Sequence, residues 1–184
     1  MSDTALLIID IQNDYFPGGK MELERAAAAA ARARQALDKF RKLGRPVIHV
    51  QHLSARPSAT FFIPGTEGAE IHPLVTPAEG EAVVQKTYPN SFRDTDLKAR
   101  LEKGGIKKLA VAGMMTHMCV DASVRQAFDL GFGCTVLSDA CATRAQTHEA
   151  QEIPAVQVHG AFLAALRGVY AEVMPTEDFL KTIS

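Results

Sequence analysis

Short, continuously apolar runs alternate with amphipathic stretches along the whole chain. Runs such as residues 5–9, 47–50 and 109–112 show no polar alternation, which is typical of strands covered on both faces. Stretches with helical spacing, such as residues 22–43 and 116–130, lie between them. This alternation predicts an α/β fold, a three-layer sandwich with helices on both faces of a parallel sheet. Residues 1–184 show no internal repeat or linker and are expected to form a single domain.

The individual elements follow from this pattern and from its Gly and Pro interruptions. The expected strands cover residues 5–9, 47–52, 83–86, 107–112, 132–137 and 169–174. The expected helices cover residues 22–43, 94–103, 116–130, 147–168 (one or two helices, interrupted near Pro154) and 176–180. Residues 54–76 form the longest irregular segment, and a segment of this length is expected to act as a lid or pocket wall.

Composition excludes several classes of partner. The net charge of −1 and the pI near 6.6 give no electrostatic reason to expect binding to nucleic acid or to a membrane surface. Three cysteines fit a reducing compartment better than a disulfide framework. The first residues lack the pattern of a signal peptide, and no apolar run has the length of a membrane span. We therefore expect a soluble cytoplasmic protein with a small-molecule partner.

Three expected strands end at, or lead directly into, a reactive side chain: Asp10, Lys86 and Cys119. The carboxyl ends of parallel strands lie along one edge of the sheet, so these groups can converge despite their separation in sequence. An ammonium beside a thiol favours the thiolate, and a carboxylate can carry protons. Each residue alone also has an ordinary structural explanation, as a turn residue, a surface lysine or a small buried residue. Their joint placement favours a catalytic site.

The segment Gly113-Met114-Met115-Thr116-His117-Met118-Cys119-Val120 links a strand to a helix. Thr116 is the expected N-cap, which places Cys119 in the first helical turn. Free N–H groups and the positive end of the helix dipole there stabilise a thiolate or a developing oxyanion. Cys119 is therefore expected to be alkylated faster than Cys134, expected in mid-strand, or Cys141, expected in a loop.

The chain resembles the isochorismatase-like cysteine hydrolases, a superfamily that includes nicotinamidases and N-carbamoylsarcosine amidases. The resemblance covers essentially the whole chain and rests on residues 6–15 (LLIIDIQNDY), on Lys86 and on residues 113–120. It implies a sheet of about six strands and a catalytic triad of Asp10, Lys86 and Cys119. It also implies a cis peptide bond before Met115 and an oxyanion hole formed by the backbone N–H groups of Met115 and Cys119.

Departures from the family pattern narrow the expected chemistry. Nicotinamidases carry an Asp-x-His pair with further histidines as a metal site, whereas this chain has Gln51 and His52 followed by Phe61 and Phe62. We therefore expect no catalytic metal and no cofactor. Isochorismatases proper cleave a vinyl ether without this cysteine, so Cys119 points to thiolate chemistry. The resulting prediction is hydrolysis of a small amide, ureido or related acyl compound through a thioester.

Six further residues are candidate substrate contacts. Aromatic residues are candidate pocket walls and polar residues candidate hydrogen-bonding groups: Tyr15, Phe61, Phe62, Gln51, Asn90 and His117. Packing is an equally good explanation for each aromatic residue. The resemblance and the apolar segment 162–166 predict a homo-oligomer, either a dimer or a tetramer.

Two other classes of function stay open from the sequence alone. One is a member of the fold that binds a small ligand without turning it over. The other is a thiol redox protein in which Cys119 works with Cys134 or Cys141 as resolving partner. That interpretation requires the two sulfur atoms to lie within disulfide reach.

Overall fold

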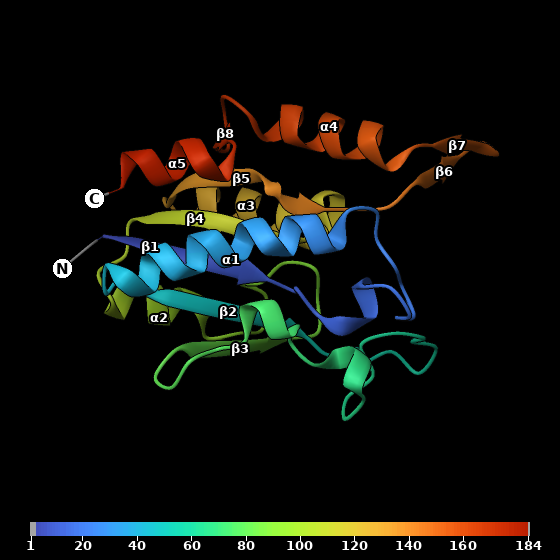
Figure 1. Cartoon of the computed structure of the whole chain (residues 1–184), viewed down its shortest axis with the longest axis horizontal. Helices are drawn as coiled ribbons and strands as arrows, with labels where there is room; N and C mark the ends of the chain where they lie inside the picture. The colour runs from blue at the N-terminus through green and yellow to red at the C-terminus, as the bar shows by residue number, and fades with distance from the viewer. Residues whose placement is uncertain (1–2, 184) are drawn as a thin grey trace.

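The computed structural model describes residues 3–183 and is built around a six-stranded sheet (Figure 1). The strands of this sheet are β1 (Thr4–Ile9), β2 (Val47–His52), β3 (Ala82–Lys86), β4 (Lys108–Met114), β5 (Gly133–Ala142) and β8 (Glu172–Met174). Their spatial order is β3-β2-β1-β4-β5-β8, and every neighbouring pair is parallel. The predicted parallel sheet of about six strands is confirmed.

Helices cover both faces of the sheet, as predicted for a three-layer sandwich. Within residues 3–183 the α-helices are α1 (Ala26–Lys42), α2 (Leu97–Lys103), α3 (Asp121–Asp129), α4 (Ala155–Leu166) and α5 (Thr176–Thr182). Side chains of α1 and α5 form one apolar core with the sheet, and those of α2, α3 and α4 form the other. Short 3₁₀ turns span Asn13–Tyr15, Glu67–Ala69 and Pro73–Val75, and a π-helical turn spans Thr116–Val120.

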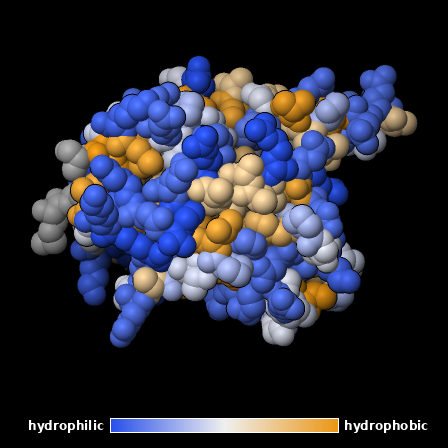
Figure 2. Space-filling model, viewed as in Figure 1, coloured by the Kyte–Doolittle hydropathy of each residue, from blue (hydrophilic) through white to orange (hydrophobic). Residues whose placement is uncertain are grey.

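The alanine-rich part of α1 fits the helix closely against the sheet. Ala26, Ala29 and Ala30 are buried in the core, whereas Ala27 and Ala28 are exposed. Figure 2 shows hydrophilic side chains over most of this face of the molecule, with a limited apolar patch among them. The alanines of α1 therefore combine high helix propensity with close packing against the sheet.

The prediction of a helix over residues 147–168 was wrong in its first part. Two short antiparallel strands, β6 (Gln146–His148) and β7 (Gln151–Ile153), form a hairpin that projects from the body of the protein (Figure 1). Glu149 and Ala150 turn the chain with φ angles of 47° and 62°. The helix α4 begins only after Pro154, because proline lacks an N–H and suits the start of a helix.

Strand β5 is longer than predicted and ends at Ala142 rather than near residue 137. Cys141 was expected in a loop, but it lies within this strand and pairs with Gly113 of β4. Cys134 lies in the same strand, near its beginning rather than in its middle, and all three cysteines are buried and unpaired.

The apolar segment 162–166 belongs to α4 and serves the core only in part. Leu163 and Leu166 are buried, whereas Ala164 and Ala165 are exposed. Its role in a dimer or tetramer stays a prediction. Within residues 3–183, no helix has both the length and the apolar character required to cross a membrane.

A partly buried polar cluster ties α1 to the edge of the sheet. The Arg41 guanidinium donates to both carboxylate oxygens of Glu81, at 2.7 and 2.8 Å. His49 lies 2.9 Å from the same carboxylate through Nε2, and its buried Nδ1 has no partner among the described residues. The hydrogen bond from Arg41 lowers the pKa of Glu81 to about 2. Burial lowers the pKa of His49, so its neutral form is favoured in the folded state.

We expect the protein to lose stability in acid in two stages. Below about pH 6.5 the unfolded chain protonates His49 before the folded protein does, so the free energy of unfolding falls. Between about pH 4.5 and 2 the protonation of Glu81 removes a further contribution. Urea unfolding at pH 7, 5.5 and 4 measures the first stage and the onset of the second.

The variant Glu81→Gln isolates the second stage. It should lower the free energy of unfolding at pH 7 by about 1–3 kcal/mol and flatten the decrease below pH 4.5. Glu102→Gln on the exposed surface is the matched control and should behave like the wild type. A wild-type stability that does not change between pH 7 and pH 4 would contradict the roles assigned to His49 and Glu81.

Candidate active site

Three reactive side chains meet at the carboxyl edge of the sheet. Asp10 directly follows β1, Lys86 is the last residue of β3, and Cys119 lies in the turn after β4. The Lys86 ammonium donates to Asp10 Oδ2 at 2.6 Å and to Cys119 Sγ at 3.3 Å. Asp10, Lys86 and Cys119 are 0%, 2% and 5% exposed. The structure thus brings together the three residues that were predicted to converge.

The backbone at Asp10 turns sharply to aim the carboxylate. Its φ angle is 52°, in the left-handed region that Asp and Asn tolerate better than most residues. Its N–H still donates to Val50 O at 3.0 Å, so the turn begins at a residue that is hydrogen-bonded to β2. A strained backbone at a buried ionic group is a common feature of functional sites.

The turn between β4 and α3 agrees only in part with the one predicted. The peptide bond between Met114 and Met115 is cis, as the resemblance implies, but the next five residues form a π-helical turn rather than the first turn of an α-helix. Thr116 was expected to cap the helix, but its hydroxyl donates to Ala142 O and contacts His159 Nδ1 instead. The Met115 carbonyl accepts the N–H groups of Met118 and Val120.

Gly113 permits this turn to approach β1. Its φ angle is 151°, and a Cβ atom at this position would lie 2.2 Å from the carbonyl oxygen of Ile9. Only glycine allows the two strands to lie this close while the chain turns toward Cys119.

Lys86 is charged in this environment. Burial opposes the ammonium form, but the Asp10 carboxylate and the hydrogen bonds to Asp10 and Cys119 outweigh it and raise the pKa of Lys86. The ammonium also donates to Tyr88 O at 3.1 Å and lies 3.0 Å from His52 Nδ1. Lys86 is therefore a fixed positive charge between a carboxylate and a sulfur.

The expected low pKa of Cys119 was wrong for the free protein. Burial, and next the Asp10 carboxylate, raise the pKa of the Cys119 thiol, and these causes outweigh the opposite effect of Lys86. Asp10 Oδ1 is buried and has no hydrogen-bond partner among residues 3–183. In the resting state the site therefore holds a neutral thiol beside a carboxylate that has one free oxygen. Cys134 and Cys141 are also buried, and burial raises the pKa of each to about 12. We therefore no longer expect Cys119 to be alkylated faster than the other two cysteines.

Three aromatic candidates pack together above the site. The ring of Tyr15 lies 4.6 Å from that of Phe62 and 6.1 Å from that of Phe61, between centroids. Burial and the nearby Asp10 carboxylate raise the pKa of Tyr15. The Asp14 carboxylate accepts the N–H of Phe62 at 2.6 Å and so fastens segment 54–76 to the turn that follows β1.

The three polar candidates already have partners within the protein. The Gln51 amide donates to Ala69 O and accepts from Gln85. Asn90 donates to Gln126, and His117 Nδ1 contacts the Thr143 hydroxyl. In this structure these side chains therefore use hydrogen-bonding groups within the protein.

One neighbour of the triad, His52, was not among the sequence candidates. It ends β2 directly beside Lys86 in the pairing register. The signal was available, because His52 also ends a buried strand as a polar residue. The direction of its side chain, however, depends on the register with β3, which the sequence does not specify.

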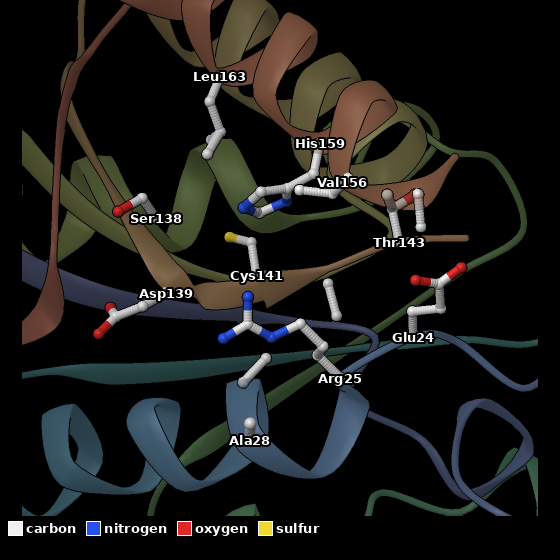
Figure 3. Close-up of a pocket in the computed structure, with 13 residues that line it drawn as sticks. Glu24, Arg25, Ala28, Ser138, Asp139, Cys141, Thr143, Val156, His159 and Leu163 are labelled. Atoms are coloured by element: carbon white, nitrogen blue, oxygen red, sulfur yellow. The ribbon is translucent and has the colours of Figure 1, made fainter. Parts of the chain in front are cut away.

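A separate cavity of about 320 Å³ lies between α1, β5 and α4 (Figure 3). Its lining includes Arg25, Cys141 and His159, but none of Asp10, Lys86 and Cys119. His159 links its wall to Thr116 in the turn that carries Cys119. The cavity is therefore adjacent to the site but distinct from it.

Atoms that can bind metals also converge at the triad. One such atom each from Asp10, His52 and Cys119 lies within 4.8 Å of the others. The Lys86 ammonium, however, is within 3.3 Å of all three residues and already supplies a positive charge at that point. A divalent cation bound there would be repelled by a buried ammonium, so these residues fit the lysine better than a metal.

Comparison with known proteins gives consistent matches over nearly the whole chain. The isochorismatase domain matches residues 4–178. The isochorismatase family protein YddQ of Bacillus subtilis is 54% identical over 97% of this chain and 99% of its own length. Streptothricin hydrolase of Streptomyces noursei is 40% identical over 76% of this chain and 49% of its own length. A crystal structure of an isochorismatase-type hydrolase from Oleispira antarctica has a TM-score of 0.94 and 50% identity, covering 97% of this chain and 96% of its own.

We expect a strong chelator to leave the protein unchanged. Dialysis against EDTA should alter neither the melting temperature nor the turnover of any amide substrate, because Lys86 occupies the point where the potential ligand atoms meet. Metal analysis of the dialysed protein provides the control. A loss of activity that one equivalent of Zn²⁺ or Fe²⁺ restores would show that the ammonium does not replace a metal.

Proposed function

Because the chain belongs to the isochorismatase family and is an isochorismatase-like hydrolase, we propose that it hydrolyses a small amide, ureido or related acyl compound through a thioester on Cys119. The observation that carries this proposal is the position of the Lys86 ammonium, 2.6 Å from Asp10 and 3.3 Å from Cys119. The proposed nucleophile and the proposed proton carrier therefore both contact the fixed charge, an arrangement that suits covalent acyl transfer.

The first half of the reaction forms the thioester. Cys119 passes its proton to Asp10 as Sγ attacks the carbonyl carbon, and the carbonyl electron pair moves to oxygen. The free Oδ1 of Asp10 supports this role, since a buried carboxylate oxygen without a partner is available to accept a proton. We propose that the N–H groups of Met115 and Cys119 stabilise the oxyanion. Asp10 then gives its proton to the nitrogen as the C–N bond breaks, and the amine leaves.

The second half hydrolyses the thioester. Asp10, again a carboxylate, removes a proton from a water molecule, and the resulting hydroxide forms a bond to the acyl carbon. The C–S bond breaks, the proton returns to Cys119, and the carboxylic acid leaves. Lys86 stays an ammonium throughout and compensates the negative charge on whichever neighbour carries it.

The ligand-binding alternative and the redox alternative with Cys134 receive less support from the structure. A purely ligand-binding role does not require a buried thiol, carboxylate and ammonium in contact. A redox role with Cys134 conflicts with the sheet register, because Cys134 pairs with Leu109 while Cys119 follows Met114 at the other end of β4. Five residues of strand span about 17 Å, which exceeds disulfide reach.

The test is a screen of small amides and ureido compounds for release of ammonia or amine. Cys119→Ala should lower turnover by at least about 10³-fold, because no other group can form the thioester. Asp10→Asn should impair turnover strongly while ligand binding is kept. Rapid quenching of the wild type should reveal an acyl mass on the peptide that contains Cys119.

Cys134→Ala is the matched control, since it removes another buried cysteine far from the site and should keep full activity. Turnover of the same substrate by Cys119→Ala at the wild-type rate would exclude the covalent mechanism.

A further inference from the structure

His52 touches the triad, but the proposed reaction gives it no role. It is the last residue of β2 and pairs with Lys86 of β3 in the parallel register. Neighbouring side chains on adjacent strands project from the same face of a sheet. As a result His52 Nδ1 lies 3.0 Å from the Lys86 ammonium nitrogen.

We propose that His52 is a positioning residue of this site: its neutral imidazole accepts a proton of Lys86 at Nδ1 and holds the ammonium between Asp10 and Cys119. This inference rests on the proposed function, because it concerns the same triad. It adds a role that acts through Lys86 rather than on the substrate.

The hydrogen bonds of the ammonium support this role. A lysine ammonium has three protons to donate. Here four groups lie within reach of it, at 2.6 Å (Asp10), 3.0 Å (His52), 3.1 Å (Tyr88 O) and 3.3 Å (Cys119). The thiol sulfur is the weakest and most distant acceptor. The other three groups therefore fix the orientation of the ammonium in the resting state.

The role of His52 becomes important when Asp10 takes the thiol proton. Asp10 is then neutral, and its attraction for Lys86 falls. His52 Nδ1 and Tyr88 O keep their positions and do not change charge in this step. They hold the ammonium beside the sulfur and the developing oxyanion, where a displacement of about 1 Å can cost roughly 100-fold in rate.

His52 must be neutral to accept this hydrogen bond. The charged and titratable groups that face it are Asp10 after β1, Lys86 on β3, Arg56 in the loop after β2, and Cys119 in the π-helical turn. Burial, and next the charge of Lys86, lower the pKa of His52 to about 4. With Nδ1 as acceptor, the single ring proton is assigned to Nε2.

The backbone of His52 is held independently of its imidazole. Its N–H donates to Gln12 Oε1 at 2.8 Å, and its carbonyl accepts from Gln12 Nε2 at 2.9 Å. The end of β2 should therefore stay in place when the side chain is replaced. Asparagine can place an acceptor oxygen near the position of Nδ1, whereas leucine fills similar space without an acceptor.

Two measurements test the proposal. The first is ¹⁵N NMR of the His52 ring in the wild type, which needs no substrate. We expect a neutral imidazole at pH 7 with the proton on Nε2. The second is the burst of nitrophenolate from 4-nitrophenyl acetate, which reports acylation of Cys119. His52→Leu should slow this burst at least about tenfold, and His52→Asn should recover most of the rate.

Either measurement can overturn the proposed role of His52. A charged ring, or a proton on Nδ1, at pH 7 would overturn the proposal even if His52→Leu does not fold. Equal burst rates for the wild type, His52→Leu and His52→Asn would also overturn it, and so would equal losses in both variants. A burst that persists in Cys119→Ala would instead refute the proposed function, while the NMR result would still decide the state of His52.

Discussion

A buried ion pair between Lys86 and Asp10 is the contact on which the site depends. Both side chains are fully buried, and their charged atoms lie 2.6 Å apart. Removing two charges from water is costly, and such a pair is often no more stabilising than apolar residues of the same volume. Removal of one partner, however, leaves an uncompensated charge and costs about 3–5 kcal/mol. The burial of this pair is therefore better explained by a role in the site than by a gain in the free energy of unfolding.

The sheet supplies the geometry for this pair. β1 and β3 are not neighbours, because β2 lies between them, so Lys86 must extend past the end of β2 to reach Asp10. The contact with His52 at the end of β2 lies on this path. On the other side, Gly113 lets β4 approach β1 and so directs the turn that carries Cys119. Three adjacent strand ends and one glycine thus determine where the charges meet.

The sequence predicts those parts of the protein that depend on local pattern. Unbroken apolar runs located the strands because central parallel strands are covered on both faces. The hairpin at Gln146–Ile153 was missed because its side chains are mostly exposed and polar and follow no clear period. Asp10, Lys86 and Cys119 were found because each ends a strand or follows one. His52 was missed because its contact depends on the register of β2 and β3. The predicted thiolate form of Cys119 was wrong because burial and the Asp10 carboxylate raise the pKa of the thiol. These effects depend on the three-dimensional structure, and they outweigh the helix end that was expected to lower this pKa.

In the proposed mechanism Cys119 of the free protein is a thiol, Asp10 takes its proton, and Lys86 is the permanent charge. The most direct test of this charge distribution is the ultraviolet absorbance of the thiolate as a function of pH, taken as the difference between wild type and Cys119→Ala. We expect no Cys119 thiolate at pH 7 and a titration above the pKa of about 8.5 of an ordinary thiol. In Asp10→Asn the titration should move to lower pH, because the Asp10 carboxylate is one cause of the raised pKa. A Cys119 thiolate already formed at pH 7 in the wild type would contradict this charge distribution.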